Sequence, residues 1–101
     1  MYALITRLRF KTEGGPAMEA AETRRQSDET AAQAGFRAFA VVRIGPTEAL
    51  FVRIYDSREE LAAGFSQGFA PHLGEQFASK PERVEGEVMV SRWVEHPEPA
   101  S

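Results

Sequence analysis

The sequence predicts one α+β domain of the ferredoxin-like type. In this fold a β-α-β-β-α-β order gives a four-stranded antiparallel sheet with both helices on one face. Two observations predict it. Four segments rich in β-branched and aromatic residues alternate with two segments rich in helix-forming residues. The chain has 101 residues, which is enough for one domain and not for two. We expect this domain to span residues 1–96 and residues 97–101 to form a flexible tail.

The first strand and the first helix have clear boundaries. Tyr2–Phe10 is rich in β formers and predicts a strand. Pro16 suits the first position of a helix, Gly35 suits the end of one, and Ala17–Ala34 is dominated by helix formers. This helix has no large apolar stripe, so we expect a face of small residues to lie on the sheet. That face consists of Ala17, Ala20, Thr23, Ser27, Thr30, Ala31 and Ala34.

A hairpin and a final strand complete the predicted sheet. Phe36–Ile44 and Ala49–Tyr55 both read as strands, and the short turn Gly45–Glu48 between them predicts an antiparallel hairpin. Val84–Val94 predicts the last strand.

The second helix begins at a capping box, with Ser57 as the cap and Glu60 three residues later. Apolar residues then recur at every fourth position: Leu61, Phe65, Phe69, Leu73 and Phe77. Glycine and proline residues interrupt the pattern. We therefore expect two helical pieces, Arg58–Ser66 and Ala70–Ala78.

The two faces of the predicted sheet differ in composition, because strand side chains alternate between faces. Even-numbered strand residues are nearly all aliphatic, and we assign them to the face under the helices. Odd-numbered residues mix arginine, methionine and large aromatics, as interfaces do. They are Ile5, Arg7, Arg9, Arg37, Phe39, Val41, Arg43, Phe51, Arg53, Tyr55, Met89, Ser91 and Trp93. We expect a second copy of the chain to cover this face and form a homodimer.

Composition excludes several classes of function. A net charge of −3 argues against a nucleic-acid binder, although the order of elements is shared with RNA-recognition domains. The absence of cysteine and the presence of only two histidines exclude thiolate and histidine-rich metal sites. No apolar run approaches the roughly 18 residues of a membrane span, and no secretory signal is visible. We expect a cytoplasmic protein that binds neither membranes nor nucleic acid.

Two stretches resemble a known family. Phe51–Leu61 is similar to its third strand running into a capped helix, and Phe69–Leu73 with Phe77 resembles its Ser/Thr-Pro-His…Phe stretch. The family is the dimeric α/β-barrel superfamily, and the likeness is closest to antibiotic biosynthesis monooxygenase-like domains. The resemblance implies two sheets facing each other in a dimer, with a pocket between each sheet and its second helix. Some members oxidise polycyclic aromatic compounds with O2 and neither metal nor flavin.

The same superfamily includes haem-degrading enzymes, which use an Asn, a Trp and a His. This chain contains no Asn, so that set is incomplete.

Candidate catalytic residues are His72 and Arg53. His72 has the right basicity to deprotonate a phenol or enol, and Arg53 is placed to hold an anion between two aromatic residues. Otherwise His72 only opens the second helical piece. The substrate-binding candidates are Phe51, Tyr55, Phe65, Phe69 and Trp93, which line a pocket or pack as core and interface. For the other strand arginines we expect salt bridges or solvation.

The resulting expectation is a cofactor-independent monooxygenase-like protein that binds a small aromatic or enolisable compound in a dimeric barrel. The alternative is a non-catalytic homodimer that binds or senses a small molecule. No cofactor is expected in either case.

Overall fold

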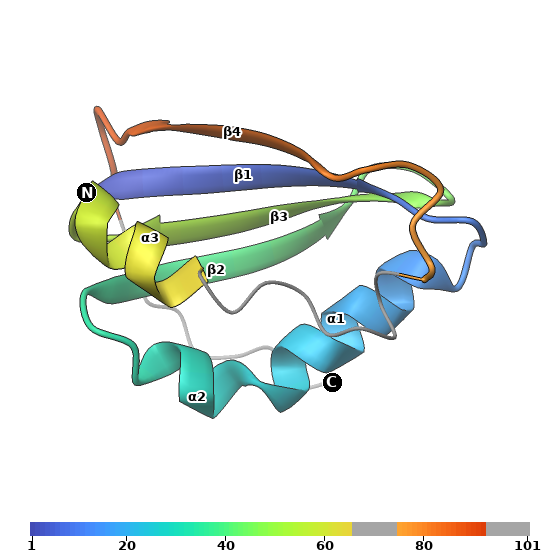
Figure 1. The fold of residues 1–101 in the computed structure, drawn as a ribbon, viewed down its shortest axis with the longest axis horizontal. Coiled ribbons are helices and arrows are strands. Elements are labelled where there is room, and N and C mark those ends of the chain that lie inside the picture. The colour runs from blue at the N-terminus through green and yellow to red at the C-terminus, as the bar shows by residue number, and fades with distance from the viewer. Residues whose placement is uncertain (66–74, 93–101) are drawn as a thin grey trace.

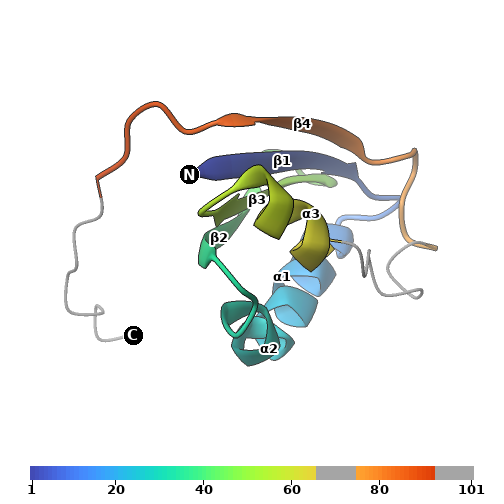
Figure 2. The same cartoon turned by 60° about the vertical axis from the view of Figure 1, so that its left-hand side comes forward.

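The computed structural model describes residues 1–65 and 75–92. Four antiparallel strands form one sheet in the order β2-β3-β1-β4. The strands are β1 (Tyr2–Arg9), β2 (Phe36–Arg43), β3 (Glu48–Tyr55) and β4 (Glu82–Glu87). The helices α1 (Gly15–Arg25), α2 (Ser27–Ala31) and α3 (Arg58–Phe65) all lie on one face of this sheet (Figures 1 and 2). The ferredoxin-like fold and the predicted β2–β3 hairpin are therefore confirmed.

The predicted first helix is two helices in the structure. The chain turns at Gln26, whose φ of −91° and ψ of 3° leave the helical region. The face that meets the sheet matches the predicted one only in part. Thr23 and Thr30 are buried as predicted, but Glu19 is buried with them, and Ala17, Ala31 and Ala34 are exposed. A helix without large apolar residues gains little from any one rotation about its axis, so its sequence did not define the buried face.

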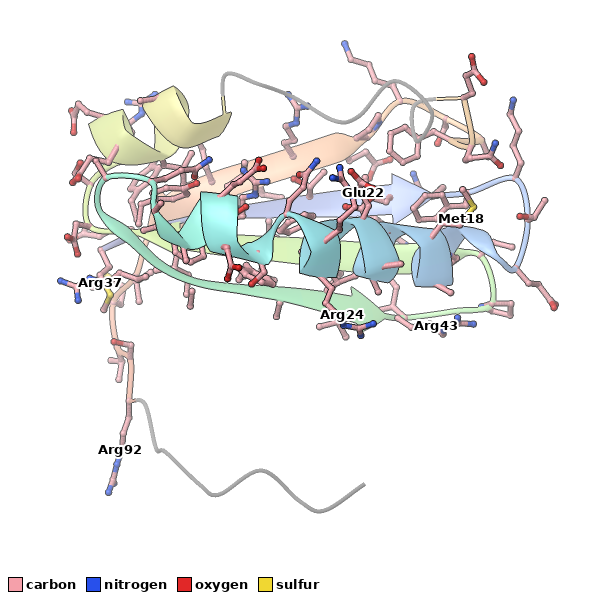
Figure 3. The ribbon with its side chains drawn as sticks, turned by 90° about the horizontal axis from the view of Figure 1, so that it is seen from below. Met18, Glu22, Arg24, Arg37, Arg43 and Arg92 are labelled. Carbon is pink, nitrogen blue, oxygen red and sulfur yellow. The ribbon has the colours of Figure 1, made fainter. Side chains whose placement is uncertain are left out.

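Figure 3 shows side chains that project from two sides of α1. Met18 and Glu22 project from one side of the helix, and Arg24 projects from the other.

The capping box at the start of α3 is confirmed. The backbone N–H of Glu60 donates to Ser57 Oγ at 3.2 Å, and Ser57 Oγ donates to Glu60 Oε1 at 2.9 Å. The described part of this helix runs to Phe65, and Ser66, its predicted last residue, lies outside the described residues. Most of the predicted second piece lies outside the described residues.

Residues 75–78, the end of that predicted second piece, are not helical. Phe77 instead forms an antiparallel bridge with Phe10, and the backbone N–H of Ala78 donates to the carbonyl of Arg9 at 2.7 Å. The apolar contact between Phe77 and Phe10, whose ring centroids are 5.3 Å apart, fixes this segment beside the end of β1. The four-residue spacing of Phe77 therefore reflects packing against the strand rather than a helix.

The last strand is shorter than predicted. β4 begins two residues early, at Glu82, and ends at Glu87 opposite Tyr2, where its partner strand begins. The backbone N–H of Val88 still donates to the carbonyl of Met1 at 3.0 Å, and the chain then runs on away from the sheet (Figure 2). Residues 89–92 therefore pair with no strand in the described part of the chain, and Trp93 and Val94 of the predicted strand lie outside the described residues.

The assignment of sheet faces was right for β1 and wrong for β2 and β3. Leu4, Thr6 and Leu8 are buried under the helices, as expected. In the register, however, Leu4 lies opposite Arg53 and Thr6 lies opposite Phe51, so the odd-numbered residues of β3 share the helix-covered face. The register with β2 places Phe39 and Val41 there too. The helices, and not a second copy, cover these aromatic residues.

The open face is aliphatic as a result. Residues that share it by register are Ala3, Ile5, Ala38, Ala40, Val42, Leu50, Val52, Ile54 and Val84. Val84 was expected under the helices, but it lies opposite Ile5 and is 68% exposed. At one end of this face Arg7 forms a salt bridge with Glu48 at 2.7 Å. Such an apolar sheet face left in water is typical of a surface that another molecule covers.

Within the described residues, no helix is both long enough and apolar enough to cross a membrane.

Candidate functional site

A polar cluster divides the core between the helices and the sheet. One apolar cluster contains Leu8, Phe10, Ala49 and Phe51, and the other contains Leu4, Tyr55 and Leu61. Thr6 lies between the two clusters on β1, and Arg53 lies between them on β3. Glu19 and Thr23 extend from α1 toward this gap. We call Thr6, Glu19, Thr23 and Arg53 the central polar cluster.

Arg53 is the cation of this cluster. Its guanidinium carbon lies 4.8 Å from the centroid of the Phe51 ring, within the range of a cation–π contact. Its charge and a side-chain hydrogen bond lower the pKa of Tyr55, and its charge also lowers the pKa of Glu19. Arg53 is therefore a charged group held among aromatic rings on the helix-covered face of the sheet.

Glu19 is the buried acid of the cluster. Its side chain is 2% exposed, and its Oε1 accepts a hydrogen bond of 3.5 Å from Thr23 Oγ1, one helical turn along α1. Its Oε2 accepts no hydrogen bond from any described residue. Burial raises the pKa of Glu19 to about 7, against the charge of Arg53 and the hydrogen bond from Thr23, which both lower it. The carboxyl group is thus poised between its neutral and charged forms near neutral pH.

Tyr55 closes the opposite end of the site. Its hydroxyl is buried and donates to Gln33 Oε1, and Gln33 Nε2 donates to the carbonyl of Gly64 at 3.4 Å. Burial raises the pKa of the Tyr55 hydroxyl, and the charge and hydrogen bond of Arg53 oppose that shift. These contacts connect β3 to α3 through the segment that follows α2.

A groove of about 320 Å³ adjoins this connection on the outer side. It is lined by Gln33, Ala34, Glu59, Glu60, Ala63 and Gly64. Its two carboxylates make it acidic, and one of them, Glu60, accepts the hydrogen bond from Ser57. An acidic groove of this kind does not suit an anionic ligand.

The structure brings together three of the predicted site residues, namely Phe51, Arg53 and Tyr55, on the helix-covered side of β3. Phe69, His72 and Trp93 lie outside the described residues. Phe65 is described only as the last residue of α3. The roles of these four residues therefore stay predictions.

Sequence reasoning did not place Glu19, Thr23 or Gln33 in the candidate site. Glu19 was not placed on the predicted buried face of the first helix, but it faces the sheet. A usable signal existed, since Glu19 and Thr23 are four residues apart and so share a helix face. Nothing in the local sequence indicated that Gln33 meets Tyr55, which is 22 residues away.

In the described part of the chain, no three His, Asp or Glu side chains group closely enough to hold a metal ion.

Proteins of known structure share this architecture. No family model matches the chain, and no curated protein matches it. The crystal structure of an antibiotic biosynthesis monooxygenase superposes with a TM-score of 0.72 and 14% identity, covering 89% of this chain and 100% of that one. A variant of SnoaB, a cofactor-independent oxygenase from Streptomyces nogalater, gives a TM-score of 0.69 and 18% identity over 89% and 94%. A dimeric ferredoxin-like protein from an uncultured marine organism gives 0.64 and 16% over 94% and 100%.

These likenesses confirm the predicted resemblance at the level of fold. The chain shares the ferredoxin-like fold with these three structures.

Proposed function

We propose that this chain binds a small aromatic or enolisable compound as an anion at Arg53 and oxidises it with O2 without a bound cofactor. One observation carries the proposal: a guanidinium group lies on the inner face of a central strand, in contact with Phe51 and Tyr55. Aromatic rings suit a planar ligand, and a guanidinium suits its phenolate or enolate oxygen.

The chemistry follows from stabilising that anion. A phenolate or enolate is electron-rich at carbon and can itself supply the electrons that reduce O2. One oxygen atom then enters the substrate, and the other leaves as water. Arg53 would stabilise the anion more strongly here than in water, because the site has a low dielectric constant and an ion pair is stronger where water is excluded. Fold likeness to a cofactor-independent oxygenase supports the same reaction class.

A homodimer completes the proposal. The open face carries aliphatic side chains across all four strands, and the chain contributes no second layer to cover it in the described part. Covering each such side chain recovers about 25 cal/mol per Å² of apolar area. A second copy that presents the same face would supply the cover, as in a symmetric dimer.

Oxygen uptake with a panel of naphthols, hydroquinones and 1,3-diketones tests the proposal, with EDTA present throughout. We expect uptake with at least one compound and a loss of about tenfold or more in Arg53→Met, which keeps the apolar stem but removes the charge. Arg24→Met is the matched control, because Arg24 projects from the outer side of α1 (Figure 3).

Binding of a panel compound without oxygen uptake would favour the alternative, a non-catalytic small-molecule-binding module. Uptake that is equal in the Arg53→Met and Arg24→Met variants would reject the proposed site.

A further inference from the structure

One acid in the core has no role in the function proposed above. Glu19 is nearly fully buried, and one of its two carboxylate oxygens accepts no hydrogen bond from any described residue. Buried polar atoms are normally hydrogen-bonded, because an unsatisfied one carries the full cost of its removal from water. A folded protein that keeps such a group at its centre invites a functional explanation.

The position of Glu19 supplies that explanation. It comes from α1 and is acted on by the charge of Arg53 on β3, and among the described residues Thr23 is its one hydrogen-bonding neighbour. A ligand anion at Arg53 and a charged Glu19 would compete for the same positive charge. Both cannot be fully neutralised by one guanidinium in a site of low dielectric.

We propose that Glu19 is a positioning residue that takes up a proton when an anionic ligand binds to Arg53. In the empty site the carboxylate balances Arg53. In the occupied site the ligand anion balances Arg53, and Glu19 is the neutral acid. This inference rests on the proposed function, since it requires an anion at Arg53.

The proton balance identifies the ligand class. A phenol or enol that enters as the neutral molecule gives its proton to the site and binds as the anion, so no net charge enters the core. A ligand that is already an anion must draw the proton from solvent. The site therefore favours weakly acidic hydroxyl compounds over strong acids.

The groups that act on Glu19 set its behaviour with pH. Arg53 faces it from β3 and Glu22 lies one turn away on α1, where Glu22 also accepts a hydrogen bond of 2.8 Å from Gln26. Burial raises the pKa of Glu19 to about 7, so proton uptake falls in an accessible range. Anion binding should then weaken as the pH rises, because a charged Glu19 competes with the ligand.

Two fluorescent probes separate charge from ring binding. 1-Anilinonaphthalene-8-sulfonate stays an anion throughout the range, and N-phenyl-1-naphthylamine has the same rings without the sulfonate. Dissociation constants are measured from about pH 5.5 to about pH 8.5, a range in which histidines also titrate. The informative comparison is therefore between the wild type and Glu19→Gln.

We expect the anionic probe to bind the wild type at least about fivefold more weakly at the high end of the range, the usual lower limit of site–site coupling. Glu19→Gln should lose that part of the pH dependence, and the neutral probe should show none of it in either protein. Thr23→Val should move the midpoint to higher pH, since it removes the hydrogen bond that lowers the pKa of Glu19. That variant also serves if Glu19→Gln does not fold.

An unchanged pH profile in Glu19→Gln, or an unmoved midpoint in Thr23→Val, overturns the inference and leaves the proposed function standing. If Arg53→Met keeps the preference for the anionic probe, no anion binds at Arg53, and both the proposed function and the inference fail.

Discussion

The hydroxyl of Tyr55 donates a hydrogen bond to the side-chain oxygen of Gln33 and so joins the end of β3 to the segment after α2. Gly64 of α3 lies directly against this pair. A Cβ atom added there would stand 2.6 Å from the Tyr55 hydroxyl oxygen and 2.6 Å from Gln33 Oε1. Three elements thus meet at one hydrogen bond, and the absence of a side chain at Gly64 makes the contact possible.

Replacing Gly64 by alanine should therefore destabilise the protein despite the higher helix propensity of alanine. We expect a net loss of about 1–2 kcal/mol, because the overpacking cost exceeds the gain in propensity. Urea unfolding followed by circular dichroism measures it. The control is Gly86→Ala, where an added Cβ meets nothing within 4 Å. Equal stability of the two variants would contradict the packing argument.

Tyr55→Phe removes the hydroxyl that donates the hydrogen bond to the side-chain oxygen of Gln33. A buried hydrogen bond of this kind contributes about 1 kcal/mol, and we expect a loss of that size in the free energy of unfolding. Combining Tyr55→Phe with Gln33→Leu in a double-mutant cycle isolates the pair. A coupling energy near zero would show that the contact adds nothing to stability.

Glu19 predicts an unusual dependence of stability on pH. Its pKa rises from 4.5 in the unfolded chain to about 7 in the folded protein, so the folded state binds the extra proton between these values. Its contribution is complete below pH 4.5 and is lost as the pH rises toward 7, by at most about 3 kcal/mol.

Other acids also change the free energy of unfolding with pH, so the contribution of Glu19 must be measured against a variant that lacks its carboxyl group. The pKa values of Glu48 and Glu82 are lowered by hydrogen bonds to Arg7 and Arg9, respectively, so these two acids contribute stability that is lost as the pH falls. We therefore expect the difference in unfolding free energy between wild type and Glu19→Gln to change steadily from about pH 4 to about pH 7.5. Parallel curves would mean that Glu19 ionises normally.

The aliphatic open face of the sheet predicts a homodimer. Ile5→Lys puts a charge at the centre of the aliphatic face, and we expect it to shift the homodimer toward monomer by about 100-fold or more in dissociation constant. Sedimentation velocity measures the change. Met18→Lys is matched in exposure, since Ile5 and Met18 are both 39% exposed, but Met18 projects from α1 (Figure 3). A monomeric wild type, or an equal effect of both substitutions, would contradict the assignment of this face.

Local signals in the sequence were sufficient for the order of elements. Ser57 and Glu60 defined the start of α3, and the short turn before Glu48 defined the hairpin, because capping and turn formation depend on residues close in the chain. Arg53, Phe51 and Tyr55 were also identified as a group, since alternate residues of one strand always share a face.

The sequence by itself determined which residues alternate together within each strand, and with that the fold and half of the candidate site. Only the tertiary structure decided which set faces the helices. An even-numbered residue of β1, Leu4, lies opposite an odd-numbered residue of β3, Arg53, and this register depends on contacts between strands far apart in the chain. The rotation of α1 that buries Glu19 was decided in the same way. A helix of small residues has no intrinsic inner face, so its orientation comes from the sheet against which it packs.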